Sequence, residues 1–147
     1  MASGLVRRAT AASLLIAVVV LGCGRSGPPL VEVRGTLQYQ GKPLTNGAIM
    51  FNPTQDGVGH VANSAISPLG EFRMSTFNAE DGVMPGEYTI TVRSFKVRPG
   101  ANLEDPLTII GSPLCVPKRY SDPAKSDLRC TISADSAAQD MALQLTD

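Results

Sequence analysis

Two cysteines, Cys115 and Cys130, are the residues whose chemistry depends most on where the chain places them. In an oxidising compartment they can form a disulfide, and closing a loop of about 15 residues is worth about 3 kcal/mol in the chain-entropy model. The alternative is a pair of free thiols that pack as small apolar residues. We expect the disulfide, in a stabilising role, because neither cysteine has a neighbouring histidine or helix terminus that would activate it as a nucleophile.

One histidine and two pairs of acids are the other candidates for chemistry. His60 is the only histidine in the chain, whereas zinc sites normally use several histidine or cysteine ligands. We therefore expect no metal site and interpret His60 as a surface or strand-end residue. Adjacent carboxylates, as at Glu80-Asp81 and Glu104-Asp105, occur in calcium and glycosidase sites. Without an alternating acidic run, solvated turn residues are the favoured interpretation, and no catalytic residue, ligand-binding residue or cofactor is predicted.

The amino-terminal segment has the pattern of an export signal. Arg7 and Arg8 precede an uncharged apolar run at residues 11–21. A basic start followed by a run of this length is typical of a secretory signal peptide and is short for a transmembrane helix. We expect residues 1–22 to be a signal peptide helix.

The apolar run ends at Gly22-Cys23, which resembles the bacterial lipobox. In that motif the cysteine is acylated and becomes the mature amino terminus. We expect lipidation of Cys23 and a short lipidated tether at residues 23–30, rich in Gly, Ser and Pro. The alternatives are ordinary cleavage nearby or an uncleaved anchor.

The charge of the remaining chain limits its partners. The sequence has 13 basic and 13 acidic residues. Removing residues 1–22 takes away two arginines, leaving 11 basic and 13 acidic residues and a net charge near −2. Nucleic acid is an unfavourable partner for such a chain, and an anionic membrane would not attract it. The expected membrane attachment is through the lipid alone.

The clearest strand of the sequence follows the turn at Pro85-Gly86. Apolar and polar side chains alternate there with a period of two, which predicts one buried and one wetted face. The tyrosine near its start is expected to bond its hydroxyl to nearby backbone, as in a tyrosine corner. The predicted buried side chains are Tyr88, Ile90 and Val92, and the predicted wetted ones are Thr89, Thr91 and Arg93.

The same alternation recurs along the chain and predicts about seven short strands, as in a sandwich or barrel. Gly35 falls on an apolar face, where it predicts a bulge or a close backbone approach. Residues 97–127 have no sustained period apart from a short edge strand at 107–110, so this long segment must be functional or pinned. The other expected inward side chains are Val31, Val33, Leu37, Tyr39, Ile49, Phe51, Phe72, Met74, Met141, Leu143 and Leu145.

Four motifs in order resemble the bacterial transthyretin-like, carboxypeptidase regulatory-like lipoproteins. They are GTLQYQGKPLTNGAIMFNP, SPLGEFRMST, DGVMPGEYTITV and VPKRYSDPAKSDLRCTI. The resemblance implies that residues 31–147 form an all-β domain, a seven-stranded antiparallel Greek-key β-sandwich of the prealbumin type. It implies no defined activity, because a fold alone does not specify one.

These observations predict a lipid-anchored, non-enzymatic lipoprotein of the bacterial cell envelope. It would face the periplasm or the cell surface and act as a structural or interaction module, with an envelope protein or glycan as its partner. The alternative is a small carbohydrate- or peptide-binding domain that uses residues 97–127.

Overall fold

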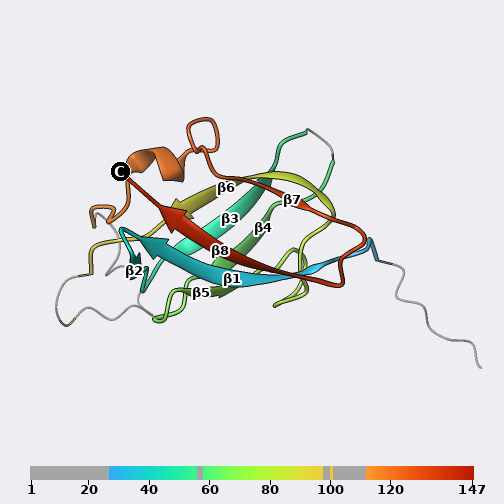
Figure 1. The fold of residues 1–147 in the computed structure, drawn as a ribbon, viewed down its shortest axis with the longest axis horizontal. Helices are drawn as coiled ribbons and strands as arrows, with labels where there is room; N and C mark the ends of the chain where they lie inside the picture. The colour runs from blue at the N-terminus through green and yellow to red at the C-terminus, as the bar shows by residue number, and fades with distance from the viewer. Residues whose placement is uncertain (1–26, 56–57, 98–99, 101–111) are drawn as a thin grey trace, which may run out of the picture.

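The structure is a computed structural model that describes residues 27–55, 58–97, 100 and 112–147 (Figure 1). None of the helices in these ranges is long and apolar enough to cross a membrane. The described elements are the strands β1 (Glu32–Tyr39), β2 (Lys42–Pro43), β3 (Ala48–Pro53), β4 (Ala62–Ala65), β5 (Glu71–Arg73) and β6 (Gly86–Arg93), the short 3-10 helix η1 (Lys118–Ser121), and the strands β7 (Arg129–Ile132) and β8 (Ala138–Leu145).

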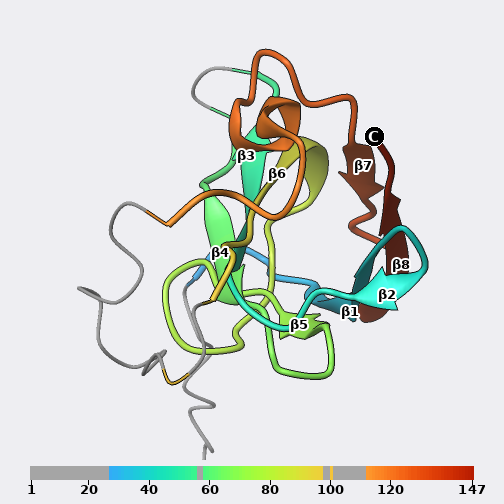
Figure 2. The same ribbon diagram turned by 90° about the vertical axis from the view of Figure 1, so that its left-hand side faces the viewer.

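The strands form two four-stranded sheets, which confirms the predicted all-β class. In the first sheet, β1 pairs with β8, β5 and β2. In the second sheet the order is β4-β3-β6-β7. Figure 2 shows β1 and β8 facing β3 and β6 across the interior.

One strand pairing differs from the antiparallel arrangement that was expected. β8 lies parallel to β1 in continuous register, from Glu32 opposite Ala138 to Tyr39 opposite Leu145. β7 runs antiparallel to β6, and the chain then turns back into β8 at the end of the molecule where β1 begins (Figure 1). β8 therefore joins the other sheet in the same direction as β1. Side-chain alternation indicates which face of a strand is buried, but it does not indicate the neighbour or its direction.

The hydrophobic core lies between the sheets and draws on both of them. The inward faces predicted for the strands are confirmed, with Tyr39, Met141 and Leu143 partly buried at the margin. Burial of a Val, Leu, Ile, Phe or Met side chain is worth about 1.5–3 kcal/mol. The largest fully buried side chains are Tyr88, Tyr120, Phe51, Leu37, Ile49, Met74, Ile90, Ile132, Leu145, Val33, Val83 and Val92.

Gly35 occupies a position where three strands meet closely, as its place on the apolar face predicted. It lies opposite Phe72 of β5 on one side and Met141 of β8 on the other. A Cβ atom at this position would lie 2.1 Å from the Met141 carbonyl oxygen and 2.7 Å from the Phe72 ring. A larger residue would therefore push β8 or β5 away from β1.

Tyr88 has the structural role that was predicted for it. Its ring is buried and packs against Phe51, with ring centroids 6.0 Å apart. Its hydroxyl donates a hydrogen bond of 2.8 Å to the carbonyl oxygen of Met84, four residues earlier. The bond fixes the turn that leads into β6.

The prediction of a wetted face on β6 is wrong for Thr89 and Thr91, whereas Arg93 at the end of the strand is exposed as predicted. Thr89 and Thr91 are only 7% and 5% exposed. Asn52 of β3 donates hydrogen bonds from its amide to the Thr91 hydroxyl at 3.1 Å and to the Thr89 carbonyl at 3.2 Å, and η1 packs against the same strand. Threonine is compatible with either environment, so the alternation could not distinguish a covered face from a wet one.

Candidate functional site

Residues 112–128 run beside the half of β6 that β7 does not reach. The register of β7 along β6 ends at Thr89. Beyond that point, side-chain and backbone groups of the irregular segment donate hydrogen bonds to the free carbonyl oxygens along this edge. The described part of residues 97–127 is therefore pinned to the sheet, which is one of the two alternatives expected for this segment. These bonds are Ser126 Oγ to Ile90 O at 2.5 Å, Ser121 Oγ to Val92 O at 3.4 Å and Cys115 N to Ser94 O at 2.9 Å.

Tyr120 anchors η1 to the end of β8. Its side chain is buried, and its hydroxyl donates to the Thr146 carbonyl at 3.1 Å and accepts from the Thr146 N–H at 3.1 Å. The Arg119 guanidinium donates to the same hydroxyl at 2.9 Å and to the Thr146 carbonyl at 2.8 Å. This network places the charge of Arg119 firmly at the surface beside η1.

A hollow of about 470 Å³ opens beside η1, and we call it the basic hollow. It lies between the end of β6, η1 and the turn that follows η1. Four of its lining side chains are basic and one is acidic, which gives the lining a formal charge of +3. The lining residues are Arg93, Lys118, Arg119, Ser121, Asp122, Pro123 and Lys125.

Part of the positive charge of the basic hollow has no counter-charge. Lys125 pairs with Asp122 at 3.6 Å, and Arg119 donates to the main-chain oxygens of Thr146 and Asp147 and interacts electrostatically with the Asp147 carboxylate. Within the ranges the structure describes, Arg93 and Lys118 have no ion-pair partner, and both are exposed. Such a lining can hold an anionic group. Its one hydroxyl, on Ser121, donates to the Val92 carbonyl and has no histidine beside it to act as a base.

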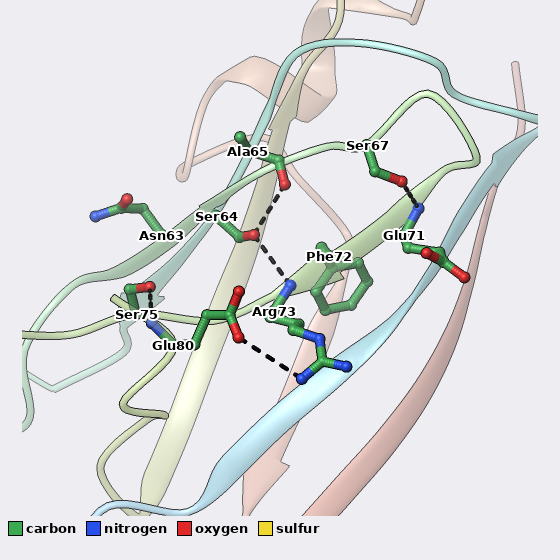
Figure 3. Close-up of a pocket in the computed structure, with 9 residues that line it drawn as sticks. All are labelled: Asn63, Ser64, Ala65, Ser67, Glu71, Phe72, Arg73, Ser75 and Glu80. Carbon is green, nitrogen blue, oxygen red and sulfur yellow. Dashed lines mark hydrogen bonds and ion pairs between the residues drawn. The ribbon is translucent and has the colours of Figure 1, made fainter. Parts of the chain in front are cut away.

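A second hollow, of about 370 Å³, lies where β4 and β5 join the two sheets (Figure 3). Its hydroxyls hold the backbone together: Ser64 Oγ accepts from the Arg73 N–H at 3.1 Å and donates to the Ala65 carbonyl at 2.9 Å. Arg73 also pairs with Glu80 at 3.6 Å. Because these polar groups already bond one another, we interpret this hollow as a structural seam. It is lined by Asn63, Ser64, Ala65, Ser67, Glu71, Phe72, Arg73, Ser75 and Glu80.

Asp81 organises the loop before β6. Its carboxylate accepts backbone hydrogen bonds from Thr76 at 2.7 Å, Phe77 at 3.0 Å and Asn78 at 2.7 Å. Partial burial acts to raise the pKa of Asp81, but the backbone donors outweigh it and hold the pKa below its ordinary value. With Glu80 paired to Arg73, the two carboxylates are turn residues, as expected.

The two predicted disulfide cysteines are free thiols at opposite ends of β6. Cys130 lies opposite Tyr88 in the β6–β7 register, whereas Cys115 bonds to the backbone of Ser94. Six residues of extended chain separate these two points, a distance of about 20 Å. A disulfide needs Cα atoms within about 7 Å. The fold is therefore incompatible with a Cys115–Cys130 bridge, and spacing along the sequence gave no measure of that distance.

Both cysteines are partly buried and pack against the hydrophobic core. Cys115 Sγ donates to Ser94 Oγ at 2.9 Å, at the margin of the core. Burial raises the pKa of the Cys130 thiol to about 11. A thiol with a raised pKa is a poor nucleophile at neutral pH, which agrees with the alternative that the thiols pack as small apolar side chains.

His60 lies at the surface just before β4, as predicted, and its ring meets the edge of Phe77 with centroids 5.0 Å apart. Among the residues that the structure describes, no three His, Cys, Asp or Glu side chains are grouped so that they could hold a metal ion. Cys23, the Glu104-Asp105 pair and the expected strand at residues 107–110 lie outside the described residues.

The basic hollow is not among the sites predicted from the sequence. The segment VPKRYSDPAK carries Lys118, Arg119 and Lys125, a visible concentration of positive charge. Arg93 lies 25 residues before Lys118, and only the packing of η1 against β6 brings it to the same hollow. The concentration of positive charge in this segment was therefore the one signal of the hollow in the sequence. The contribution of Arg93 to its lining could be known only from the fold.

Comparison with known proteins adds no assignment. No protein family model, no curated protein and no solved structure matches this chain.

Proposed function

We propose that this chain is a lipid-anchored, non-enzymatic interaction module of a bacterial cell envelope, attached through Cys23. The sequence supports the anchor, with Arg7 and Arg8, the apolar run at residues 11–21 and the Gly22-Cys23 ending. The protein would face the periplasm or the cell surface. The membrane is its partner through the lipid, and a second partner binds the part of the domain that the anchor holds away from the membrane.

The observation that carries this proposal is the placement of the tether and of η1 at opposite ends of the molecule. The described tether, residues 27–30, leaves at the end of the molecule where β1 begins, whereas η1 and the end of β8 lie at the other end (Figure 1). A lipid attached before residue 27 would leave η1 and the basic hollow pointing away from the membrane.

The surroundings of the tether agree with this orientation. Residues 27–30 line a hollow together with Phe77, Asn78, Ala79 and Asp81 of the loop before β6. The described tether therefore stays at this end of the domain and does not run along the sandwich towards η1. Phe77 is half exposed there, which suits a surface close to lipid headgroups.

For the fold, we propose a seven-stranded Greek-key sandwich of the transthyretin type, with one parallel pair. The sheet orders β5-β1-β8 and β4-β3-β6-β7 support it. They contain seven strands when the two-residue β2, which pairs only with the end of β1, is treated as an extension of that hairpin.

A role without catalysis is supported by how the reactive side chains are used. The seam hydroxyls bond backbone groups, and burial raises the pKa of the Cys130 thiol. The second candidate function is a small binding domain for a carbohydrate or a peptide, and the basic hollow favours it because part of residues 97–127 forms its lining.

The anchor is tested with Cys23→Ser. Several acyl chains, each contributing about 0.8 kcal/mol per buried CH₂, hold a protein on a membrane where one chain would not. We expect the variant to move to the soluble fraction or to accumulate as an uncleaved precursor, with Cys130→Ser as the matched control that stays in the membrane. Normal processing and membrane fractionation of Cys23→Ser would show that the anchor is elsewhere.

A further inference from the structure

We propose that the basic hollow binds an anionic polysaccharide through the carboxylate or phosphate groups on its sugar units. The inference rests on the proposed function, since it names the partner at the end of the molecule that faces away from the tether. It is carried by the charge, the shape and the limited contact chemistry of the hollow.

The charge selects an anion. Arg93 and Lys118 are exposed cations without an ion-pair partner in the described part of the chain. The Arg119 guanidinium is fixed in position by hydrogen bonds to the main-chain oxygens of Thr146 and Asp147, at 2.8 and 2.9 Å. An arginine whose rotamer is already fixed loses less side-chain entropy when it binds an anion.

The shape suits several charged groups along a chain. The cations come from three places: Arg93 at the end of β6, Lys118 and Arg119 on η1, and Lys125 in the turn after it. They surround a hollow of about 470 Å³, within the range of about 300–1,000 Å³ that ligand sites usually have. Charges spread over three elements match a ligand with repeated charges better than a single small ion.

The hollow lacks the groups that would bind a peptide. An extended peptide needs a free strand edge, but the neighbouring edge of β6 is already bonded by Ser121 and Ser126. A peptide anchored by side chains needs apolar side-chain pockets, and Pro123 is the only apolar residue among the lining residues that the structure describes. The charged groups and the Ser121 hydroxyl oxygen of the described lining are contacts that a charged glycan can use.

A neutral glycan fits less well. Among the described residues of the lining there is no aromatic side chain on which a sugar ring could stack. The aromatic side chain of η1, Tyr120, is buried and has the Arg119 guanidinium over its ring at 4.6 Å. Recognition would therefore depend on the anionic groups of the polymer and weaken as salt screens them.

The test is a binding titration of the full-length protein in detergent. Membrane attachment is not required in this assay, so the result does not depend on whether the anchor proposal is correct. The probes are polygalacturonate for carboxylate, dextran phosphate for phosphate, and dextran as the neutral polymer. We expect one or both charged polymers to bind at low salt, and the pattern identifies the group recognised. Absence of binding by both, or equal binding of dextran, would overturn the proposal.

The double variant Arg93→Gln/Lys118→Gln locates the site. It should weaken binding about tenfold, the loss expected for two surface charge contacts. The matched control is Arg34→Gln/Arg73→Gln, which removes the same charge from a neighbouring pair on β1 and β5 and should retain affinity. An equal loss in the control would show attraction by net charge only. Poly-glutamate that binds as tightly as the glycans would assign the hollow to an acidic protein instead and overturn the glycan partner.

Discussion

Cys130 lies on β7 opposite Tyr88, and its partial burial raises the pKa of its thiol from the ordinary 9.0 to about 11. Burial has this effect because the thiolate loses solvation that the neutral thiol does not need. The folded state therefore binds the proton more tightly than the unfolded state. The thiol contributes its full stability below pH 9.0, and that contribution is lost as the pH rises through about 11.

We predict that alkylation of Cys130 continues to accelerate with pH well above 9. In the Cys115→Ala variant with Cys23 acylated, Cys130 is the remaining thiol. Its rate with iodoacetamide should rise towards pH 11, whereas the rate of the denatured protein should level off near the ordinary pKa of 9.0. A plateau of the native rate at the denatured position would show that the thiol is not shielded. A missing thiol in the denatured, non-reduced wild type would contradict the separation of Cys115 and Cys130.

Single residues were predictable when their environment is set by the neighbouring chain. Tyr88 follows the Pro85-Gly86 turn, so its hydroxyl reaches Met84 within four residues. Gly35 sits in the alternation of β1, which showed that its position faces inward. The prediction of a Cys115–Cys130 disulfide was wrong because a disulfide depends on the distance between the two residues in space, which no local sequence pattern encodes.

At the level of elements, β6 and the segment beside it form one unit. β3 pairs with β6 along the whole length of β3, from Ala48 opposite Arg93 to Pro53 opposite Tyr88. The other edge of β6 is shared between β7 and residues 112–128, and the Ser126 hydroxyl makes the shortest side-chain bond to that edge. Ser126 is buried, so its bond to the Ile90 carbonyl is shielded from water.

We predict that Ser126→Ala destabilises the protein by about 1–3 kcal/mol, the cost of leaving a buried acceptor without its donor. The loss should appear in urea unfolding as a lower midpoint with an unchanged slope, since the area exposed on unfolding stays the same. Amide exchange at Lys125 and Ser126, whose N–H groups bond to the Asp122 carbonyl at 3.0 and 2.8 Å, should also become faster.

Ser133→Ala is the control for that measurement. Ser133 is exposed and its hydroxyl accepts a single bond of 3.3 Å from Asp135, so the change should stay within about 0.5 kcal/mol. If Ser126→Ala cost no more than Ser133→Ala, the segment would be held to β6 by packing and not by the hydroxyl.

The period-two pattern predicted the long strands and their inward faces well, because one side of each meets the core. It could not predict β6 as a strand buried on both sides, since the covering segment has no period of its own. Nor could it predict the parallel pairing of β8, because the same alternation fits either direction of a neighbouring strand. The basic hollow depends on that same non-periodic segment, and for this reason it was missed.

On the scale of the whole molecule, the domain has two different ends. One end carries the tether at residues 27–30 and the loop with Phe77 and Asp81. The other carries η1, the end of β8 and the basic hollow. β1 runs between them with 8 residues, a length of about 26 Å at about 3.3 Å per residue. An anchor at one end and a cationic surface at the other separate attachment from binding.

We predict that the anchored protein holds the η1 end away from the bilayer. In a Cys115→Ala/Cys130→Ala background, a fluorophore at Ala79→Cys should be quenched strongly by headgroup-labelled lipids in proteoliposomes, and one at Lys118→Cys weakly. Both positions are exposed, so labelling should disturb neither the core nor η1. In detergent without labelled lipid the two fluorophores should behave alike, which separates membrane proximity from local effects. The separation along β1 is large enough for quenching to distinguish the two ends. Equal quenching would mean that the sandwich lies flat on the membrane. Stronger quenching at Lys118→Cys would mean that the basic hollow faces the lipid.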